Sequence, residues 1–287
     1  DPRFEKDYPS GDPSYTAYWA NVAQMDASFG RLMAELDKQK LRDNTLVFFT
    51  SDNGPARTSF HPHGETDQLR DKKGSVFEGG IRVPGIIRWP GKVKAGATES
   101  TPISGLDLLP TLCSISGLKK PAARHLDGTD ISGLFSGKKI NRAQPLYWHF
   151  HAASGGRQVA MRDGDWKLVA AIDAPKVRQR AGIAVEDQRD IKTAKLGQME
   201  LYNLKTDRAE TRDRASAEPK RLAQMTAQMK KIYVGVQKDT PQWPAWEFAR
   251  YEGQRIQWPP YRGAKKVEPR KPKIPGDFRS NPLHKRP

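Results

Sequence analysis

In the stretch "TLVFFTSDNGPARTSF", residues 45–60, an apolar run typical of a β-strand ends abruptly in polar residues. Its apolar run, Leu46–Phe49, predicts a strand over Leu46–Thr50 that is buried on both faces of a helix-covered parallel sheet. The run is followed by Asp52 and Asn53, and a Gly-Pro pair then turns the chain. Because ligands of open α/β sheets lie beyond the carboxyl ends of the strands, these side-chain oxygens suit a hard cation such as Ca²⁺ or Mg²⁺. The alternative is ordinary turn chemistry, in which the Asx residues only stabilise the turn.

A long amphipathic helix is predicted upstream of this strand. Asp12 followed by Pro13 is typical of an N-cap and a first helical position. Apolar residues then recur in steps of four and three, which places them on one helix face: Tyr18, Val22, Met25, Phe29, Leu32 and Leu36.

Downstream of the strand, a tight turn at Gly79 and Gly80 is expected to lead into a second strand over Ile81–Trp89. Asp107–Ile115 predicts a short helix that Gly117 closes. The order helix, buried strand, loop, strand and helix indicates an α/β fold.

The pattern changes to that of antiparallel strands from about Gln144. "LYWHF" and "RQVAMRDGDWKLVA" predict strands, and Asp163-Gly164 predicts the tight turn of a hairpin. "MELYNL" predicts one more strand, and Asp173–Gln198 is expected to be a long loop. Pro219 is expected to open a helix whose apolar face consists of Leu222, Met225, Met229, Ile232 and Val236. These elements indicate a small α+β unit.

The composition favours an anionic partner. The 287 residues include 49 Lys and Arg against 33 Asp and Glu, which gives a net charge of +16. Such a surplus suits nucleic acid, an anionic membrane or an acidic glycan, unless it is only a solvated basic surface. No nucleic-acid-binding signature occurs, and no apolar run is long enough to span a membrane. Residues 263–287, with eight Lys and Arg and five Pro, predict a basic tail that does not fold by itself.

A second motif, "KKGSVFEGGIRVP", occupies residues 72–84. A lysine near a cation site, here Lys73, can bind an anionic substrate group as a point charge, although an isolated lysine is more commonly solvated. Taken with "SDNG" at residues 51–54, this motif resembles the sulfatase family of the alkaline-phosphatase-like superfamily. The resemblance continues through "DLLPTL", "LDGTDISGL", "AMRDGDWKLV" and "ELYNLKTDRAET".

The resemblance implies a domain organisation. Residues 1–143 would form the C-terminal part of the catalytic α/β domain, a mixed sheet flanked by helices. Residues 144–262 would form a C-terminal α+β subdomain with antiparallel strands and a helix, and residues 263–287 a basic, Pro-rich tail.

The resemblance also implies the site residues. Asp52 and Asn53 match the family's ligands for a divalent cation, usually Ca²⁺ and less commonly Mg²⁺. Lys73 matches the lysine that contacts the substrate's sulfate. His61 and His63, in "FHPHGE", are not part of the family's cation site, but they lie on the loop between the two motifs. From this position they are expected to contact sulfate or sugar, with a zinc site or a plain surface loop as alternatives.

Other residues of the motifs are expected to support the site. Glu78 is expected to shape its loop, with Lys73 or Arg82 as a candidate partner. At least one of three residues that open the second unit is expected to face the substrate cleft: Trp148, His149 and His151.

The implied activity is hydrolysis of a sulfuric ester, in a sulfated carbohydrate or an aryl sulfate, in the periplasm or outside the cell. The family's nucleophile is a formylglycine made within a Cys/Ser-x-Pro-x-Arg motif, and the sequence around Cys113 lacks the Pro and Arg of this motif. The chain is therefore expected to be the C-terminal part of a sulfatase, with the nucleophile N-terminal to it, and to be inactive by itself.

Two alternatives remain open. One is a phosphoryl-transfer or phosphodiesterase member of the same superfamily. Such members commonly bind zinc through an Asp-His pair, so Asn53 favours sulfate. The other is a non-catalytic binder of anionic glycans.

Overall fold

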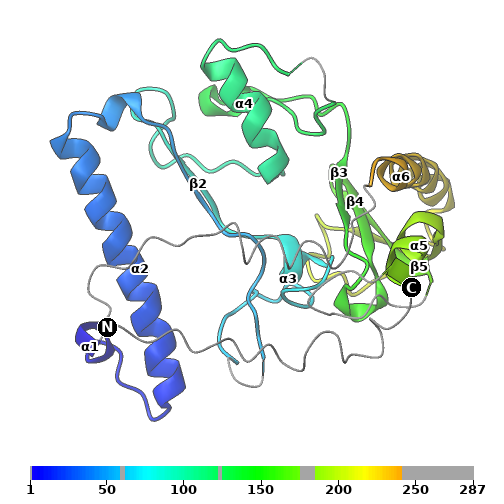
Figure 1. The fold of residues 1–287 in the computed structure, drawn as a ribbon, viewed down its shortest axis with the longest axis horizontal. Helices are drawn as coiled ribbons and strands as arrows, with labels where there is room; N and C mark the ends of the chain where they lie inside the picture. The colour runs from blue at the N-terminus through cyan, green and yellow to red at the C-terminus, as the bar shows by residue number, and fades with distance from the viewer. Residues whose placement is uncertain (1, 59–61, 122–124, 175–184, 241–287) are drawn as a thin grey trace. The chain divides into compact units, whose positions relative to one another are not determined.

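The structure is a computed structural model that describes residues 2–58, 62–121, 125–174 and 185–240 (Figure 1). All of these residues belong to one compact unit, Asp1–Trp243. The predicted tail at residues 263–287 lies outside the described residues. The domain boundary between residues 143 and 144 stays a prediction.

The N-terminal helices begin where local sequence places them. A short helix, α1 (Pro2–Glu5), precedes the long α2 (Pro13–Lys38), whose N-cap Asp12 accepts a hydrogen bond from the backbone of Ser14 at 2.8 Å. The predicted helix start is therefore confirmed. Its apolar face is only partly covered, because Met25 and Leu32 are 53% and 54% exposed.

The strand of the opening motif is confirmed as β1 (Val47–Thr50), which a 3₁₀ turn, η1 (Arg42–Asn44), precedes. It pairs antiparallel with β2 (Gly85–Arg88), with Thr50 opposite Gly85. The prediction that this strand is buried on both faces of a parallel sheet is wrong for the described residues. β1 is half-buried at three positions and exposed at the fourth, because only β2 is paired with it there.

A short helix, α3 (Glu78–Ile81), stands where a tight turn and the start of a strand were predicted. The backbone N–H of Arg82 donates to the Glu78 carbonyl at 2.8 Å and closes the helical turn. Glycine propensity argues against a helix here, but all three of Glu78, Gly79 and Gly80 are buried, so tertiary packing overrides that preference.

The next segment forms a helix around a buried carboxylate. The 3₁₀ turn η2 (Gly105–Asp107) leads into α4 (Leu108–Ile115), and Gly117, at φ 66°, follows its end as predicted. Asp107 is fully buried and forms a bidentate ion pair with Arg142, in which both N–O distances are 2.8 Å. A further 3₁₀ turn is η3 (Ser132–Ser136).

Within this compact unit, the residues predicted to form the α+β subdomain, called the second unit below, are built on an antiparallel sheet in the order β3-β4-β5-β6. Its strands, with the turn η4 (Ser154–Gly156) between the first two, are β3 (Leu146–His149), β4 (Val159–Asp163), β5 (Trp166–Asp173) and β6 (Lys195–Asn203). The predicted hairpin at Asp163-Gly164 is confirmed, with Gly164 at φ 57°.

The predicted long loop at Asp173–Gln198 is wrong in its described part. It contains a helix, α5 (Val185–Thr193), and β6 already begins at Lys195. β6 extends this far because β5 continues to pair with it as far as Asp173, although its early residues show no clear apolar alternation.

The sheet packs on both faces, as strand alternation requires. One face meets α6 (Pro219–Asp239) through Met225 and Met229 of its predicted apolar stripe, and through Tyr233, which that stripe did not include. The opposite face contacts Val76 and Phe77, next to the second sequence motif. Figure 1 shows α6 and α3 on either side of the strands. The sheet therefore lies between α6 and the loop of the second sequence motif, which carries Lys73 and is called the motif loop or Lys73 loop below.

Candidate active site

The two sequence motifs meet through their backbones. The N–H of Gly54 donates to the carbonyl of Gly80 at 2.9 Å, and the N–H of Lys73 donates to the carbonyl of Pro55 at 3.1 Å. A Cβ on Gly54 would lie 1.9 Å from the carbonyl oxygen of Gly79, so only glycine allows this approach. The segment after β1 and the loop that carries Lys73 are thus held together.

Asp52 and Asn53 lie side by side just after β1. The carboxylate Oδ1 of Asp52 accepts from the backbone N–H of Asn53 at 2.9 Å and from its side-chain amide at 3.1 Å. Within the described residues, Oδ2 of Asp52 and the amide oxygen of Asn53 accept no hydrogen bond. By their chemistry these two atoms could serve as hard donors to Ca²⁺ or Mg²⁺, but the amide would first have to turn to present its oxygen.

This pair is only part of a cation shell. Among the residues that the structure describes, no cluster of three His, Cys, Asp or Glu is placed to hold a metal ion. Since Ca²⁺ takes six to eight oxygens, the remaining ligands would have to come from elsewhere.

Lys73 has an exposed side chain on a loop fixed at its neighbours. Gly74 adopts φ 90°, which favours glycine, and its carbonyl accepts from the backbone N–H of Ser154 at 2.7 Å. The adjacent Lys72 points elsewhere, because its ammonium group binds the carbonyl of Arg57. Lys73 is therefore the lysine of this pair that is left to contact a ligand.

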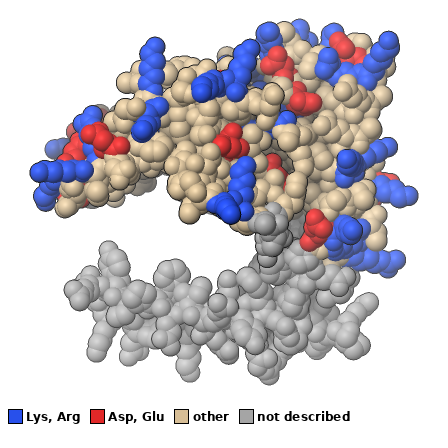
Figure 2. All heavy atoms as spheres, turned by 90° about the horizontal axis from the view of Figure 1, so that it is seen from above, with Lys and Arg blue, Asp and Glu red and all other residues tan. Residues whose placement is uncertain are grey.

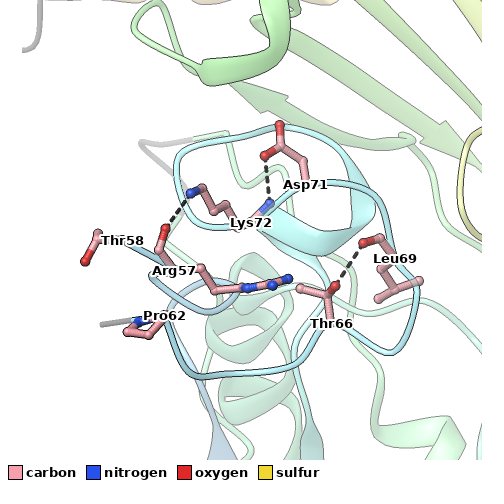
Figure 3. A pocket seen from close by; sticks show the side chains of 7 residues that line it. All are labelled: Arg57, Thr58, Pro62, Thr66, Leu69, Asp71 and Lys72. Carbon is pink, nitrogen blue, oxygen red and sulfur yellow. Dashed lines mark hydrogen bonds between the residues drawn. The ribbon is translucent and has the colours of Figure 1, made fainter. Parts of the chain in front are cut away.

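A pocket of about 430 Å³ opens beside this loop (Figure 3). Its lining is mainly polar and comprises Arg57, Thr58, Pro62, Thr66, Leu69, Asp71 and Lys72. Figure 3 shows the Arg57 side chain extending towards Thr66. The backbone N–H of Arg57 donates to the Pro55 carbonyl that also holds Lys73, so the pocket and the Lys73 loop share one anchor.

The two histidines of "FHPHGE" have different outcomes. His61 lies outside the described residues. The Nε2 atom of His63 lies 2.7 Å from the hydroxyl of Ser14, and its ring packs edge-on against Tyr15 of α2. These contacts place His63 against the start of α2. Its contact with substrate stays a prediction.

The aromatic residues of β3 lie on two sides of the sheet. His149 packs against Tyr233 of α6 with a ring separation of 5.2 Å, and against His151 at 4.6 Å. Burial lowers the pKa of His149 from 6.5 to about 4. Trp148 instead packs with the cluster that contains Phe77. Of the three, Trp148 is the one on the side of the Lys73 loop.

Glu78 does not pair with Lys73. It is buried, and it contacts Arg82 at 3.7 Å, one of the predicted partners, and Lys167 at 2.9 Å. Lys167 and Glu210 are residues around this loop that sequence reasoning missed. The alternation of β5 was the available signal, since Lys167 has the same parity as the apolar Val169.

Charge is spread over the visible surface. Lys and Arg side chains are scattered across the face in Figure 2, with Asp and Glu between them. No helix in the described ranges has the length and apolar character needed to cross a bilayer.

Comparison with known proteins identifies the class. A family model described as Sulfatase matches residues 1–118, and one described as N-sulphoglucosamine sulphohydrolase, C-terminal, matches residues 67–239. The chain belongs to the sulfatase family. Over its second match, it carries the C-terminal module of the N-sulphoglucosamine sulphohydrolase type.

Individual relatives agree with this family. Steryl-sulfatase of Rattus norvegicus is 36% identical over 146 residues, covering 49% of this chain and 25% of the relative. Arylsulfatase A of Homo sapiens is 37% identical over 148 residues, covering 51% of this chain and 29% of the relative. The chain thus spans about a quarter of the length of these relatives.

Solved structures give the same fold. The crystal structure of Ps i-CgsB matches with a TM-score of 0.66 and 28% identity over 85% of this chain and 48% of that one. Its complex with k-i-k-neocarrahexaose matches equally well, with a TM-score of 0.66 and 26% identity over 88% of this chain and 50% of that one. The α/β class with an appended antiparallel sheet is confirmed.

Proposed function

We propose that the protein containing this chain hydrolyses sulfate esters. The observation that carries the proposal is the backbone junction at Gly54 and Pro55, which joins the segment that follows the carboxylate–amide pair to the loop that carries the exposed lysine. Hard oxygen ligands and a point cation on two joined segments suit a tetrahedral, singly charged sulfate ester.

Each residue has a proposed role. Asp52 and Asn53 hold the cation, and Lys73 donates from its ammonium group to a sulfate oxygen. Because backbone hydrogen bonds fix the two segments before substrate arrives, only the Asn53 amide and the Lys73 side chain have to turn for these groups to stabilise the charge that develops on the sulfate. A bound Ca²⁺ would supply Lewis-acid stabilisation of the same oxygens. The nucleophile, a formylglycine by analogy with the family, would come from residues outside this sequence.

The proposed substrate is a sulfated carbohydrate, with a small aryl sulfate as a simpler alternative. The pocket beside the Lys73 loop supports a sugar, because its lining offers hydroxyls, a carboxylate and a guanidinium. The guanidinium of Arg57 suits a second sulfate or a carboxylate, which it can bind through two parallel hydrogen bonds. A periplasmic or extracellular location is part of the proposal.

The test is an assay of the full-length protein, made together with the formylglycine-generating machinery, on an aryl sulfate and an aryl phosphate. We expect turnover of the sulfate and at least about tenfold less of the phosphate, since Asn53 is a poor zinc ligand. Residues 1–287 alone should show no turnover, because they contain no nucleophile motif. Preference for the phosphate would overturn the proposal, as would turnover by residues 1–287 at the full-length rate.

A further inference from the structure

A row of polar side chains crosses the face of the sheet that meets the Lys73 loop. In the strand register, Lys167 of β5 is opposite Arg162 of β4 on one side and Tyr202 of β6 on the other. This face otherwise contains apolar residues such as Val169. A lysine at the centre of such a face needs a partner, because an unpaired buried charge is costly.

Glu78 and Glu210 are those partners. The ammonium nitrogen of Lys167 lies 2.9 Å from a carboxylate oxygen of Glu78 and 2.9 Å from one of Glu210. The first contact is also a hydrogen bond, whereas Oε1 of Glu210 has no hydrogen-bond geometry and is held by charge alone. Arg162 adds a second cation, 3.4 Å from Glu78. All three side chains at the centre are buried: Lys167 and Glu210 at 0% exposure and Glu78 at 2%.

Glu210 also forms hydrogen bonds with residues that flank the Lys73 loop. Its Oε2 atom accepts from the N–H of Glu78 at 2.6 Å, and its own carbonyl accepts from the guanidinium of Arg70 at 2.8 Å. Arg70 lies over the ring of Phe77, with 3.7 Å between guanidinium carbon and ring centroid. Residues at both ends of the 70–78 segment are thereby bound to one residue of the second unit.

The backbone at Glu210 is strained in the conformation that makes these hydrogen bonds. Glu210 has φ 52°, which is uncommon for a residue other than glycine. The turn is held by Asp207, whose carboxylate accepts from the backbone N–H groups of Thr211 and Arg212. Such strain persists where surrounding contacts over-determine the conformation, and it is concentrated near functional sites.

The network is a poor source of net stability. Burial raises the pKa of Glu210, with the charge of Lys167 acting in the opposite direction. Replacing a buried ion network with apolar residues is commonly neutral or stabilising, so its contribution here is to geometry. The geometry that it fixes is that of the segment between Arg70 and Glu78, in which Lys73 lies.

We propose that Lys167 and Glu210 are positioning residues that hold the Lys73 loop in its sulfate-binding position. The inference rests on the proposed function for its kinetic readout and on the contacts above for its structural one. Lys167 touches no substrate in this scheme and acts only through Glu78 and Glu210.

The kinetic test is a double-mutant cycle in the full-length protein, combining Lys167→Met with Lys73→Ala. Alone, Lys167→Met should lower kcat/KM for an aryl sulfate by roughly tenfold to a hundredfold, as a displacement of about 1 Å can do. In the Lys73→Ala background it should cost less than about twofold, since coupled residues are not additive. Lys167→Arg should recover part of the loss. Losses that simply multiply would assign Lys167 a purely structural role and overturn the proposal.

A matched control breaks an ion pair elsewhere that also contains a fully buried carboxylate. Arg142→Met removes the partner of the fully buried Asp107, and it should destabilise the protein without coupling to Lys73. Where Lys167→Met fails to fold, Lys167→Met/Glu210→Gln removes one charge of each sign and keeps an oxygen that can accept from the N–H of Glu78.

Amide hydrogen exchange supplies a readout that does not need activity. The Lys167→Met/Glu210→Gln protein should exchange faster than wild type over residues 70–80 and unchanged over α4, whereas Arg142→Met should show the reverse. Unchanged exchange over residues 70–80 would overturn the positioning role. An inactive wild-type enzyme with the expected exchange pattern would instead count against the proposed function alone.

Discussion

Gly54 and Gly79 come from two separate motifs, and a Cβ on Gly54 would lie 1.9 Å from the carbonyl oxygen of Gly79. This contact is between backbones, so no rotation of a side chain can relieve it. The junction between the Asp52–Asn53 segment and the Lys73 loop therefore depends on the absence of a Cβ atom at Gly54.

Gly54→Ala tests this junction. We expect a loss of roughly 1–3 kcal/mol in the free energy of unfolding, as for overpacking, together with a loss of sulfatase turnover. Urea denaturation and an aryl sulfate assay measure the two. Gly30→Ala in α2 is the control, because a Cβ there meets nothing within 4 Å and alanine favours the helix. Equal stability of the two variants would contradict the close approach.

Lys73→Ala should lower turnover by at least about tenfold, since a hydrogen bond to a charged group contributes roughly 1.5–3 kcal/mol. The measurement is kcat/KM of the full-length protein on an aryl sulfate. Lys72→Ala is the matched control, because the Lys72 ammonium group binds the Arg57 carbonyl and is not available to a ligand in the same way. Full activity of Lys73→Ala would make Lys73 a surface lysine.

The proposed role of Asp52 and Asn53 as cation ligands is tested by Ca²⁺ binding to the full-length protein. Asp52→Asn should weaken the affinity for Ca²⁺ by about tenfold or more, because ligand charge tunes affinity. The side-chain amide NMR signal of Asn53 should also shift on binding, as its hydrogen bond to Asp52 breaks. Asp67→Asn serves as a control on an exposed carboxylate, 83% of whose side chain is accessible. If the Asp52 and Asp67 variants bind equally well, the metal assignment fails.

Arg57 should separate large substrates from small ones. Arg57→Ala is expected to raise KM for an oligosaccharide with two or more sulfates by about tenfold, since a charge-assisted bidentate contact is lost. Its kcat and KM for a simple aryl sulfate should stay within about twofold of wild type. A parallel loss on both substrates would mean that Arg57 serves the reaction centre rather than a neighbouring sugar.

The stability of the second unit should depend on pH through His149. Its folded pKa is about 4 against an ordinary value of 6.5, so the unfolded state binds more protons between these values. The free energy of unfolding should then be highest above pH 6.5 and fall as pH drops towards 4, by roughly 1–3 kcal/mol. His151 and the carboxylate of Asp190 lie nearby, and burial lowers the pKa of His151 in the same direction.

Urea midpoints of the protein between pH 4 and pH 8 measure this dependence. His149→Phe should flatten the curve, and His125→Phe, at an exposed imidazole, should not. An unchanged pH dependence in His149→Phe would show that other groups are responsible.

The elements that were predicted correctly are those fixed by local rules. Asp12 and Pro13 start α2 whatever packs against it, and Asp163-Gly164 forms the hairpin because its turn chemistry is self-contained. Asp52, Asn53 and Lys73 were chosen as candidate site residues from the sequence, because motif spacing and family resemblance pointed to them. Their contact with a metal or a sulfate stays a prediction.

The features that were missed depend on distant partners. α3 forms in a Gly-Gly sequence only because Gly54 and the backbone of Arg70 pack against it. Lys167 was unassigned because a lysine in a strand usually faces solvent. Its burial is decided by Glu78 and Glu210, which lie far from it along the chain. Strand alternation could have placed Lys167 on the face of Val169, but local sequence cannot indicate which distant carboxylates pair with it.

The two-sided packing of the β3–β6 sheet has a consequence for natural variation in this chain. Met229 of α6 packs on one face, and Phe77, next to Glu78, packs on the other. A substitution in that helix is therefore expected to disturb the packing of the Phe77 segment through the sheet while every motif residue is intact, so sequence motifs alone would not reveal a damaged natural variant.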